Sequence, residues 1–359
     1  MTGAKAAASV VSGSGVDWLR LPAVVKVANG RYAPDENGHT VSDVIARRAA
    51  MVADAVRMFR PDVVLVDRYP RGVHEELAPA FEVLRREQPG APAVLGLRDI
   101  LDRPETILEE WKRAEHSEAI RELYRSVLIY GDRSIFDAVT EYQFPDDIAA
   151  MTTYTGYLGD DVVAPNAAEI RARYRGRGRR LVVCTLGGGR DAYPVAKAFL
   201  TAGGRLSRQG WDGLLITGPY MSVEDVAGLR NHPMAASIPI LEIVSDIPSH
   251  LAAADAVVCM GGYNTMCEVL ALAVPAVAIP RVEPRQEQLM RCEYFAQRGL
   301  LWLLYPNRLS PKRLVDAVAS VADSSSVTQP ARFREIAHHG IKATTGQLAA
   351  LLPVPVGPG

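Results

Sequence analysis

A glycine-rich turn and a polar loop within residues 255–299 carry the groups best suited to bind a phosphorylated ligand. Gly261 and Gly262 have no side chains, so a ligand can approach their backbone closely. The helix that begins behind them offers free N–H groups and the positive end of a helix dipole. The pattern therefore predicts an anion site in which a phosphate would be stabilised.

Glu268 lies three residues beyond Thr265, and this spacing has two interpretations. As structure, residues 265–268 match a capping box, in which the Glu268 carboxylate bonds back to the N–H of Thr265. As function, a carboxylate one turn inside the helix can accept hydrogen bonds from the ribose hydroxyls of a bound nucleotide. A second polar loop, residues 285–288, follows the next strand and favours the functional interpretation.

Short, continuous apolar runs frame both loops. They predict strands at Ala256–Met260 and Ala276–Ile279, with helices at Thr265–Ala273 and from about Gln286. Such runs are typical of a parallel sheet whose two faces are covered by helices. Ligands of these sheets bind at the carboxyl ends of the strands, where Gly261–Asn264 and Arg281–Gln288 lie.

The N-terminal half shows the same alternation of strands and helices. An apolar stripe at helical spacing predicts a helix over Thr40–Phe59, and the buried strand Asp62–Asp67 follows it. The other elements expected here are a strand at Ala7–Ser12, mixed strand and loop at Val16–Val27, helices at Val73–Glu87 and Pro104–Tyr124, and strands at Ala93–Arg98 and Val127–Tyr130. This order predicts a doubly wound α/β domain.

A second glycine-rich turn, Gly187–Ala192, follows a strand expected at Leu181–Leu186. The turn fits G-x-G-x-x-A, but the next strand, Leu214–Thr217, lacks the acidic end that holds the ribose of a nicotinamide cofactor. We interpret the glycines as a second backbone approach to phosphates, to which Arg190 can add positive charge. A tight strand-to-helix turn with Arg190 in solvent is the alternative.

The pattern divides the chain into two domains. We place an N-terminal domain at residues 1–160, an Arg/Gly-rich linker at 161–180, a C-terminal domain at 181–330 and a last helix at 331–352. Six arginines lie between Arg171 and Arg180. We interpret them as a solvated linker face, because Tyr174 is the one aromatic residue among them that could stack on a base.

Composition indicates a globular protein, with 48% hydrophobic residues and a formal net charge of −1. This charge balance gives no reason to expect nucleic acid binding. The four cysteines show no C-x-x-C spacing and fall inside predicted strands and helices, as expected of buried thiols in a reducing compartment. No segment reaches about 18 uncharged apolar residues, so we expect no spanning helix and a cytoplasmic location.

The run G-G-Y-N-T-x-x-E-V-L-A-L, then V-P-A-V-A-I-P and R-Q-E-Q, resembles the donor half of GT-B glycosyltransferases related to the lipid-linked N-acetylglucosaminyltransferase of peptidoglycan assembly. The resemblance is strongest from about Leu181 to Leu304. It implies two Rossmann-like, doubly wound parallel-sheet domains facing across a cleft, with the last helix crossing back to the first domain. It also implies an inverting transferase whose co-substrate is a nucleotide sugar, here a uridine diphosphate sugar, with no cofactor. No Asp-x-Asp motif occurs, so we expect no metal requirement.

The resemblance assigns donor binding to the C-terminal domain. It places the two glycine turns at the diphosphate, Glu268 at the ribose, the backbone at Val244 at the base, and Glu287 and Gln288 at the sugar. Glu287 stands where the family has Gln, which leaves the sugar open, and a first-turn carboxylate that complements the helix dipole is its alternative role. The residues expected to bind the donor are Gly187, Gly188, Gly189, Arg190, Val244, Gly261, Gly262, Tyr263, Asn264, Thr265, Glu268, Arg285, Glu287 and Gln288.

Inversion also needs a general base to take the proton of the acceptor, and we expect it in the N-terminal domain. Asp67, Asp99 and His74 are the candidates, because they lie at or just beyond predicted strand ends. Each has an alternative role as a helix cap or a surface side chain. The sequence does not distinguish lipid, glycan and natural-product acceptors. A lipid acceptor would be compatible with a peripheral contact between the protein and a membrane. The oligomeric state is also left open.

Two other functions stay open on the sequence. A sugar-nucleotide 2-epimerase uses the same fold and a similar Gly-Gly-x-x-x-x-Glu element, but it needs several acid/base side chains around the sugar. A non-catalytic nucleotide-sugar-binding protein is the third possibility.

The start of the chain departs from the resembled family. Those enzymes open with a strand, a glycine-rich loop and a helix, whereas Ala7–Ser12 matches their second strand. One strand-loop-helix unit of roughly 30 residues is therefore expected to be missing. We expect either a natural start upstream, or an impaired chain that dimerises or aggregates through the gap.

Overall fold

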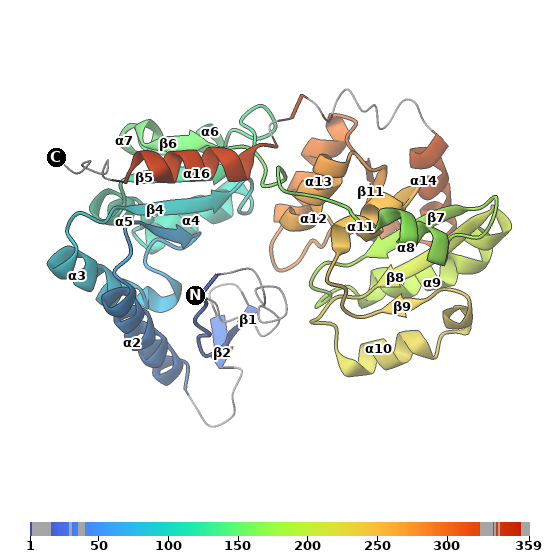
Figure 1. Ribbon diagram of the computed structural model, residues 1–359, viewed down its shortest axis with the longest axis horizontal. Coiled ribbons are helices and arrows are strands. Elements are labelled where there is room, and N and C mark those ends of the chain that lie inside the picture. Colours follow the sequence, from blue (N-terminus) through green and yellow to red (C-terminus); the bar gives the residue numbers. More distant parts are fainter. Residues whose placement is uncertain are drawn as a thin grey trace. The chain divides into compact units, whose positions relative to one another are not determined.

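The structure is a computed structural model that describes residues 1, 16–28, 31–34, 40–323, 333, 335, 336 and 338–352. It divides into two compact units. Unit 1 comprises Met1–Arg133, Asp137–Thr155 and Lys342–Gly359, and unit 2 comprises Ser134–Phe136 and Gly156–Ile341. Each unit contains a parallel sheet flanked by helices, so the predicted α/β class with two Rossmann-like sheets is confirmed (Figure 1). The strand expected at Ala7–Ser12 lies outside the described residues.

The sheet of unit 1 has the order β3-β4-β5-β6, and every neighbouring pair is parallel. Its strands are β3 (Val64–Asp67), β4 (Ala93–Arg98), β5 (Ser126–Tyr130) and β6 (Thr152–Tyr154). The two inner strands consist of almost fully buried apolar residues, which explains why their position could be predicted from continuous apolar runs. At the β3 edge, Leu65 is 43% exposed.

The other elements of unit 1 are a β-hairpin, the 19-residue helix α2 and shorter helices. They are β1 (Val24–Ala28), β2 (Arg31–Pro34), α2 (Val41–Phe59), η1 (Val73–Glu75), α3 (Ala78–Glu87), α4 (Pro104–Arg113), α5 (His116–Leu123), α6 (Ala138–Glu141), α7 (Asp146–Ala150) and α16 (Gly340–Ala350). Helix α2 begins at a capping box, since the Thr40 hydroxyl accepts from the Asp43 N–H at 3.1 Å and the Asp43 carboxylate accepts from the Thr40 N–H at 3.1 Å.

Two helices expected in unit 1 are each broken in the structure. The helix expected at 73–87 is divided, because His74 and Glu75 have left-handed backbone angles and α3 begins only at Ala78. The helix expected at 104–124 is divided at Glu115, whose φ is 47°. A left-handed residue ends the hydrogen-bonding pattern of an α-helix, and the apolar periodicity on either side does not reveal it.

The sheet of unit 2 has the order β12-β11-β10-β7-β8-β9, again with parallel neighbours. Its strands are β7 (Arg180–Thr185), β8 (Trp211–Ile216), β9 (Ile240–Leu241), β10 (Ala256–Cys259), β11 (Ala276–Ala278) and β12 (Trp302–Leu303). The central strands β7 and β10 are paired in register from Val182 and Ala256 onward. Their carboxyl ends therefore lie side by side, which places the loops that follow them together.

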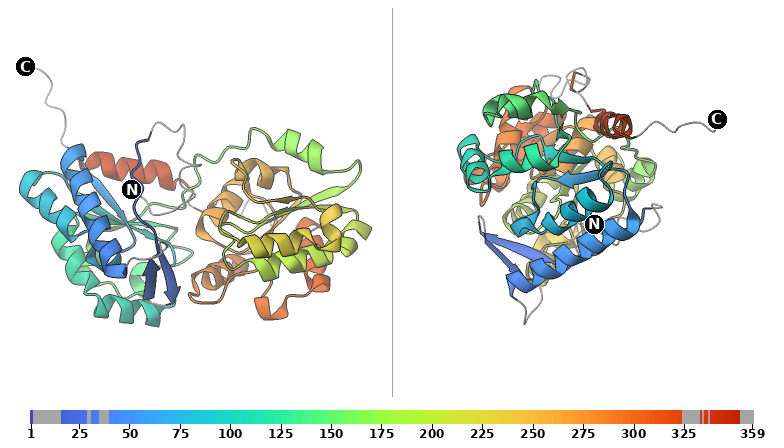
Figure 2. Two further views of the ribbon diagram at one scale, coloured as in Figure 1. Left: turned by 90° about the horizontal axis from the view of Figure 1, so that it is seen from below. Right: turned by 90° about the vertical axis from the view of Figure 1, so that its left-hand side faces the viewer.

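Helices cover both faces of this sheet (Figures 1 and 2). They are α8 (Ala167–Tyr174), α9 (Tyr193–Arg208), α10 (Val223–Arg230), η2 (Pro233–Ala236), α11 (Ile247–Ala253), α12 (Tyr263–Leu272), α13 (Glu287–Gln297), η3 (Pro306–Arg308) and α14 (Pro311–Asp323). Helices α9 and α14 pack together on one face, where Phe199 and Val318 are fully buried in the core. Helices α8 and α11 pack together on the other.

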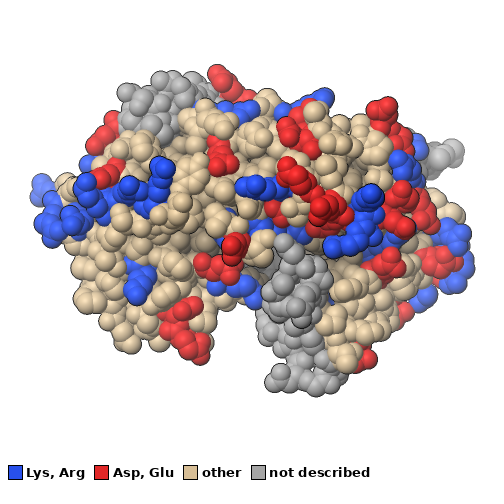
Figure 3. Space-filling view, turned by 180° about the vertical axis from the view of Figure 1, so that it is seen from behind, with Lys and Arg blue, Asp and Glu red and all other residues tan. Residues whose placement is uncertain are grey.

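The stretch expected to be a linker belongs to unit 2, and part of it is helix α8. Three of its six arginines are held by carboxylates of this unit: Arg171 pairs with Asp255, Arg179 with Asp212 at 2.6 Å, and Arg180 with Asp323. These pairs give the three a structural role, whereas the other three are exposed. On the face in Figure 3, basic and acidic side chains are interspersed.

The ends of the main segment of unit 2 are joined to each other. Leu158 and His339 form an antiparallel bridge, and the N–H of Gly340 donates to the carbonyl of Tyr157 at 3.0 Å. A Cβ at Gly340 would lie 2.5 Å from the Gly156 carbonyl oxygen, so only glycine permits this approach.

All four cysteines of the chain are buried. Among the described residues, no helix combines the length and apolar character needed to cross a bilayer.

Candidate functional site

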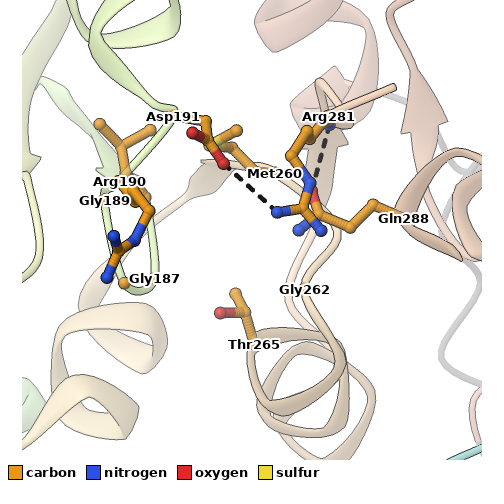
Figure 4. Close-up of a pocket in the computed structure, with 11 residues that line it drawn as sticks. Gly187, Gly189, Arg190, Asp191, Met260, Gly262, Thr265, Arg281 and Gln288 are labelled. Carbon is orange, nitrogen blue, oxygen red and sulfur yellow. Dashed lines mark hydrogen bonds and ion pairs between the residues drawn. The ribbon is translucent and has the colours of Figure 1, made fainter. Parts of the chain in front are cut away.

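Three loops at the carboxyl ends of β7, β10 and β11 surround a pocket of about 150 Å³ in unit 2 (Figure 4). Because these strands are neighbours in one parallel sheet, their following loops converge at one edge. The pocket is lined by Leu186, Gly187, Gly188, Gly189, Arg190, Asp191, Met260, Gly262, Thr265, Arg281 and Gln288. Seven of the residues predicted to bind a donor are in this set.

The turn after β7 depends on glycine for backbone packing. Gly189 has a φ of 84°, and a Cβ there would lie 2.1 Å from the Thr217 carbonyl oxygen. A Cβ at Gly218, with a φ of 89°, would lie 2.0 Å from the Gly187 carbonyl oxygen. These glycines therefore allow the loops after β7 and β8 to pack directly against each other. Helix α9 starts beyond this turn with no side-chain cap, but Pro194 has no N–H and the Val195 N–H donates to the Ala192 carbonyl at 3.1 Å, so this helix start offers few donors to an anion.

The two glycines after β10 serve different purposes. Gly261 has a φ of 73°, and a Cβ there would lie 2.2 Å from the Cys292 Sγ of α13. The Gly261 carbonyl accepts a hydrogen bond of 3.1 Å from Nη1 of the buried Arg291. Gly262, in contrast, lines the pocket, and an added Cβ would meet no atom within 4 Å. Gly261 therefore seats the turn on α13, while Gly262 leaves space for a ligand.

The capping-box interpretation of residues 265–268 is wrong. Helix α12 begins at Tyr263 with Gly262 at the N-cap and no side-chain cap. Thr265 is therefore the third residue of the helix, and its buried side chain lines the pocket. Glu268 lies one turn further along α12, outside the lining residues, and burial raises the pKa of its carboxyl to about 7.

The loop after β11 contributes Arg281 and Gln288. The backbone N–H of Arg281 donates to the Gln288 Oε1 at 3.1 Å, which fixes the orientation of that amide. The Arg281 guanidinium donates through Nη2 to Glu287 at 2.5 Å and through Nη1 to Asp191 at 3.3 Å. Figure 4 shows Arg281 reaching over the pocket toward Asp191. Arg285, which was also expected to bind the donor, is buried outside the lining set.

Of the remaining residues that were predicted to bind the donor, Arg190 lines the pocket, and Tyr263, Asn264 and Val244 do not. Tyr263 is 4% exposed and packs under the Arg291 guanidinium, 5.6 Å from its ring centroid, so it belongs to the core. Asn264 is exposed at the start of α12. Val244 lies in the segment between β9 and α11, outside the residues that line the pocket. Arg190 is exposed and lies over the Tyr220 ring, 5.7 Å from its centroid.

The candidates for a general base all lie in unit 1. Asp67 ends β3 and is exposed, whereas Asp99 follows β4 and is only 2% exposed. His74 is exposed in η1 with a φ of 50°. An acceptor could therefore reach Asp67 or His74, while the burial of Asp99 argues against direct contact. No group of three or more His, Cys, Asp or Glu side chains is arranged to hold a metal ion in the part of the chain that the structure describes.

Two charged lining residues, Asp191 and Arg281, were not among the residues assigned to donor binding. Both belong to loops that the sequence placed at the ligand edge of the sheet: Asp191 lies in the turn after β7, and Arg281 lies three residues beyond β11. Their pairing could not be foreseen, because they are 90 residues apart in the chain.

The pocket lies in a part of the chain that matches a known family model. Residues 182–342 match the glycosyltransferase family 28 C-terminal domain, which confirms the predicted resemblance for unit 2. Similar proteins include the UDP-N-acetylglucosamine--N-acetylmuramyl-(pentapeptide) pyrophosphoryl-undecaprenol N-acetylglucosamine transferases of Chromobacterium violaceum and Rubrobacter xylanophilus. The first is 28% identical over 188 residues, 50% of this chain and 51% of the relative. The second is 33% identical over 128 residues, 34% of this chain and 38% of the relative. The chain thus matches about half, or less, of the length of these relatives.

Solved structures confirm the GT-B fold over most of the chain. The kitacinnamycin glycotransferase has a TM-score of 0.58 and 18% identity, with 87% of this chain and 82% of that chain covered. Acinetobacter baumannii MurG has a TM-score of 0.54 and 14% identity, with coverage of 95% and 86%. A structure described as a UDP-N-acetylglucosamine 2-epimerase from Listeria monocytogenes has a TM-score of 0.58 and 14% identity, with coverage of 88% and 80%. At these identities the likeness concerns the fold alone.

Proposed function

We propose that this chain, whose residues 182–342 form a glycosyltransferase family 28 C-terminal domain, transfers a sugar from a uridine diphosphate sugar to an acceptor with inversion. The observation that carries the proposal is the pocket at the β7, β10 and β11 ends. The start of α12, which has no side-chain cap, adjoins it, and Arg190 and Arg281 line it. These are groups that stabilise the negative charge of a departing nucleoside diphosphate, so no metal is required.

The donor would be held by groups from three loops. The turns Gly187–Arg190 and Gly261–Thr265 would surround the diphosphate, and the backbone at Val244 would hold the base. Gln288, whose amide is fixed by the Arg281 N–H, would contact the sugar together with Glu287. The nucleotide itself acts as co-substrate, and the site needs no other cofactor.

The proposed ribose contact of Glu268 is supported by its environment. Burial raises the pKa of this carboxyl to about 7, so its charged form is poorly stabilised by the protein. Ribose hydroxyls that donated hydrogen bonds to the carboxylate would supply the missing stabilisation. A ligand of that kind explains an acidic residue at this position now that the capping box is excluded.

The proton of the acceptor would be taken by a residue of unit 1, and the exposed Asp67 and His74 are the better candidates there. The acceptor itself is open. Relatives are named for a lipid-linked acceptor, pyrophosphoryl-undecaprenol, so a lipid-linked glycan is the first class to test. An acceptor of this kind would place the enzyme on the cytoplasmic face of a membrane, as a peripheral protein.

A 2-epimerase is the second candidate, and the fold alone does not separate it from a transferase. The match to glycosyltransferase family 28 favours transfer. A non-catalytic nucleotide-sugar-binding protein would share the pocket but not the turnover.

The test has two steps on the full chain. A panel of UDP-, dTDP- and GDP-sugars is first screened for thermal stabilisation, and a ligand at about 100 times its dissociation constant should add about 2.7 kcal/mol to the free energy of unfolding. The best donor is then assayed for release of nucleoside diphosphate with and without lipid-linked and glycan acceptors. Exchange of the hydrogen at the sugar C2 without acceptor would indicate an epimerase, and binding without either reaction would indicate a binding protein.

A further inference from the structure

Arg281 is held between two carboxylates at the rim of the donor pocket. Its Nη2 donates to Glu287 at 2.5 Å and its Nη1 to Asp191 at 3.3 Å. The two contacts differ in strength. The Glu287 side chain is 17% exposed and lies beside Arg281 on the loop that leads into α13, whereas Asp191 is 46% exposed and reaches over from the turn after β7.

The charges at this pocket cancel when the site is empty of ligand. Arg190 and Arg281 are the positive side chains of the lining, Asp191 is the negative one, and Glu287 adds a second negative charge through Arg281. The formal sum of these four groups is zero. The diphosphate of a sugar nucleotide brings about two negative charges, and it would meet a carboxylate, Asp191, already placed on the guanidinium best able to receive it.

We propose that Asp191 occupies the place of a phosphate group on Arg281, and that the diphosphate of the donor displaces it. The inference rests on the proposed function, because it requires a nucleoside diphosphate in this pocket. The weaker contact is the one that breaks: the more exposed pair at 3.3 Å contributes little, while the half-buried Glu287 keeps Arg281 oriented. Arg281 thereby becomes a binding residue for the diphosphate. Asp191 lowers the affinity of the pocket for anions, because an anion has to displace it from Arg281.

One buried atom supports this arrangement. In the part of the chain that the structure describes, Arg281 Nε is buried without a hydrogen-bond partner. A guanidinium has five N–H donors, and the Nε–H is one from which a phosphate oxygen could accept. A buried donor without a partner is unfavourable, and a ligand that satisfied it would gain affinity from this position.

The test is titration calorimetry of the full chain with two probes, uridine diphosphate and inorganic pyrophosphate. Arg281→Met should weaken the binding of both probes about 10-fold or more, as expected for loss of a charge-assisted hydrogen bond. Asp191→Asn should strengthen both about 2- to 5-fold, since a competing surface ion pair is removed. The double variant should bind like Arg281→Met, because Asp191 acts only through Arg281.

Arg180→Met is the matched control. It also breaks an ion pair, with Asp323, but it lies at the opposite end of β7 from the pocket. It should change neither affinity, and circular dichroism melting should show that every variant is folded.

The two probes separate this inference from the proposed function. If the natural chain and Arg281→Met bind uridine diphosphate with equal affinity, the inference is overturned. The proposed donor site is not affected by that result. Weaker binding by Asp191→Asn would also overturn it, because Asp191 would then contact the ligand directly. Pyrophosphate bound with the expected variant effects, but no affinity for any nucleotide, would show that an anion displaces Asp191 from Arg281, and would reject both a nucleoside diphosphate as that anion and the proposed donor. Binding of neither probe would reject both.

Discussion

Replacing Glu268 with Gln should make the folded chain more stable above neutral pH and weaken nucleotide binding. Burial raises the pKa of this carboxyl from its ordinary value of 4.5 to about 7. Below pH 4.5 the group is neutral in both the folded and the unfolded chain. Between pH 4.5 and 7 the unfolded chain loses this proton while the folded chain keeps it, so stability falls as the pH rises.

The size of the effect follows from the same shift. Above pH 7 the folded chain carries a poorly solvated charge, which costs roughly 3 kcal/mol at most. Gln is neutral at every pH and nearly equal in size. The free energy of unfolding of Glu268→Gln should therefore match that of the natural chain at pH 4.5 and exceed it at pH 8 by about 1 to 3 kcal/mol.

Urea denaturation at the two pH values measures the difference. Glu224→Gln is the control, because it removes an equal charge from an exposed position in the first turn of α10. It should give no comparable gain at pH 8. In parallel, Glu268→Gln should bind uridine diphosphate about 10-fold or more weakly at pH 8, since a charged acceptor is lost.

Two results would refute this reasoning. An equal stability difference at pH 4.5 and pH 8 would show that the carboxylate is not a buried charge. Unchanged affinity for uridine diphosphate at pH 8 would withdraw the ribose contact, even if the stability result holds.

Four further predictions concern the pocket and its chemistry. Gly261→Ala should lower the free energy of unfolding by about 1 to 3 kcal/mol in urea melts, because its φ is 73° and the Cys292 Sγ fills the space. The free energy of unfolding of Gly262→Ala should stay within about 0.5 kcal/mol of that of the natural chain, while its affinity for uridine diphosphate falls in calorimetry. A stable Gly261→Ala and an unstable Gly262→Ala with unchanged affinity would refute the roles given to the two glycines. Gln288→Ala should reduce discrimination between UDP-sugars in competition assays more than affinity for uridine diphosphate, and equal losses would place it outside the sugar site. Dialysis against EDTA should leave transfer activity unchanged, whereas restoration of a lost activity by a divalent cation would contradict the proposed metal-free chemistry.

The parts of the fold that the sequence predicts well are those set by burial. Strands β4, β7 and β10 are continuous apolar runs because helices cover both faces of their sheets, and their positions were predicted to within a residue or so. The placement of the two glycine turns followed from these strands, and so did the location of the pocket.

The parts that were missed depend on contacts between distant segments. Residues 265–268 fit a capping box in spacing, but Gly262 starts the helix three residues earlier because its turn is seated on α13 through Gly261 and Arg291. Helix α8 is short and weakly amphipathic, and its Arg171 is fixed by Asp255, 84 residues away. Local periodicity carries no information on such pairs.

Because the two ends of its main segment lie side by side, unit 2 has the geometry of a domain that can be exchanged between related chains. Because Leu158 and His339 are bridged, the chain enters and leaves residues 156–341 at one point. A segment with adjacent ends can be transplanted as an inserted domain, with both splices made at the same place on the host. Chimaeras that exchange donor specificity between related chains could therefore be cut here, and Gly340 is the residue that such a junction has to retain.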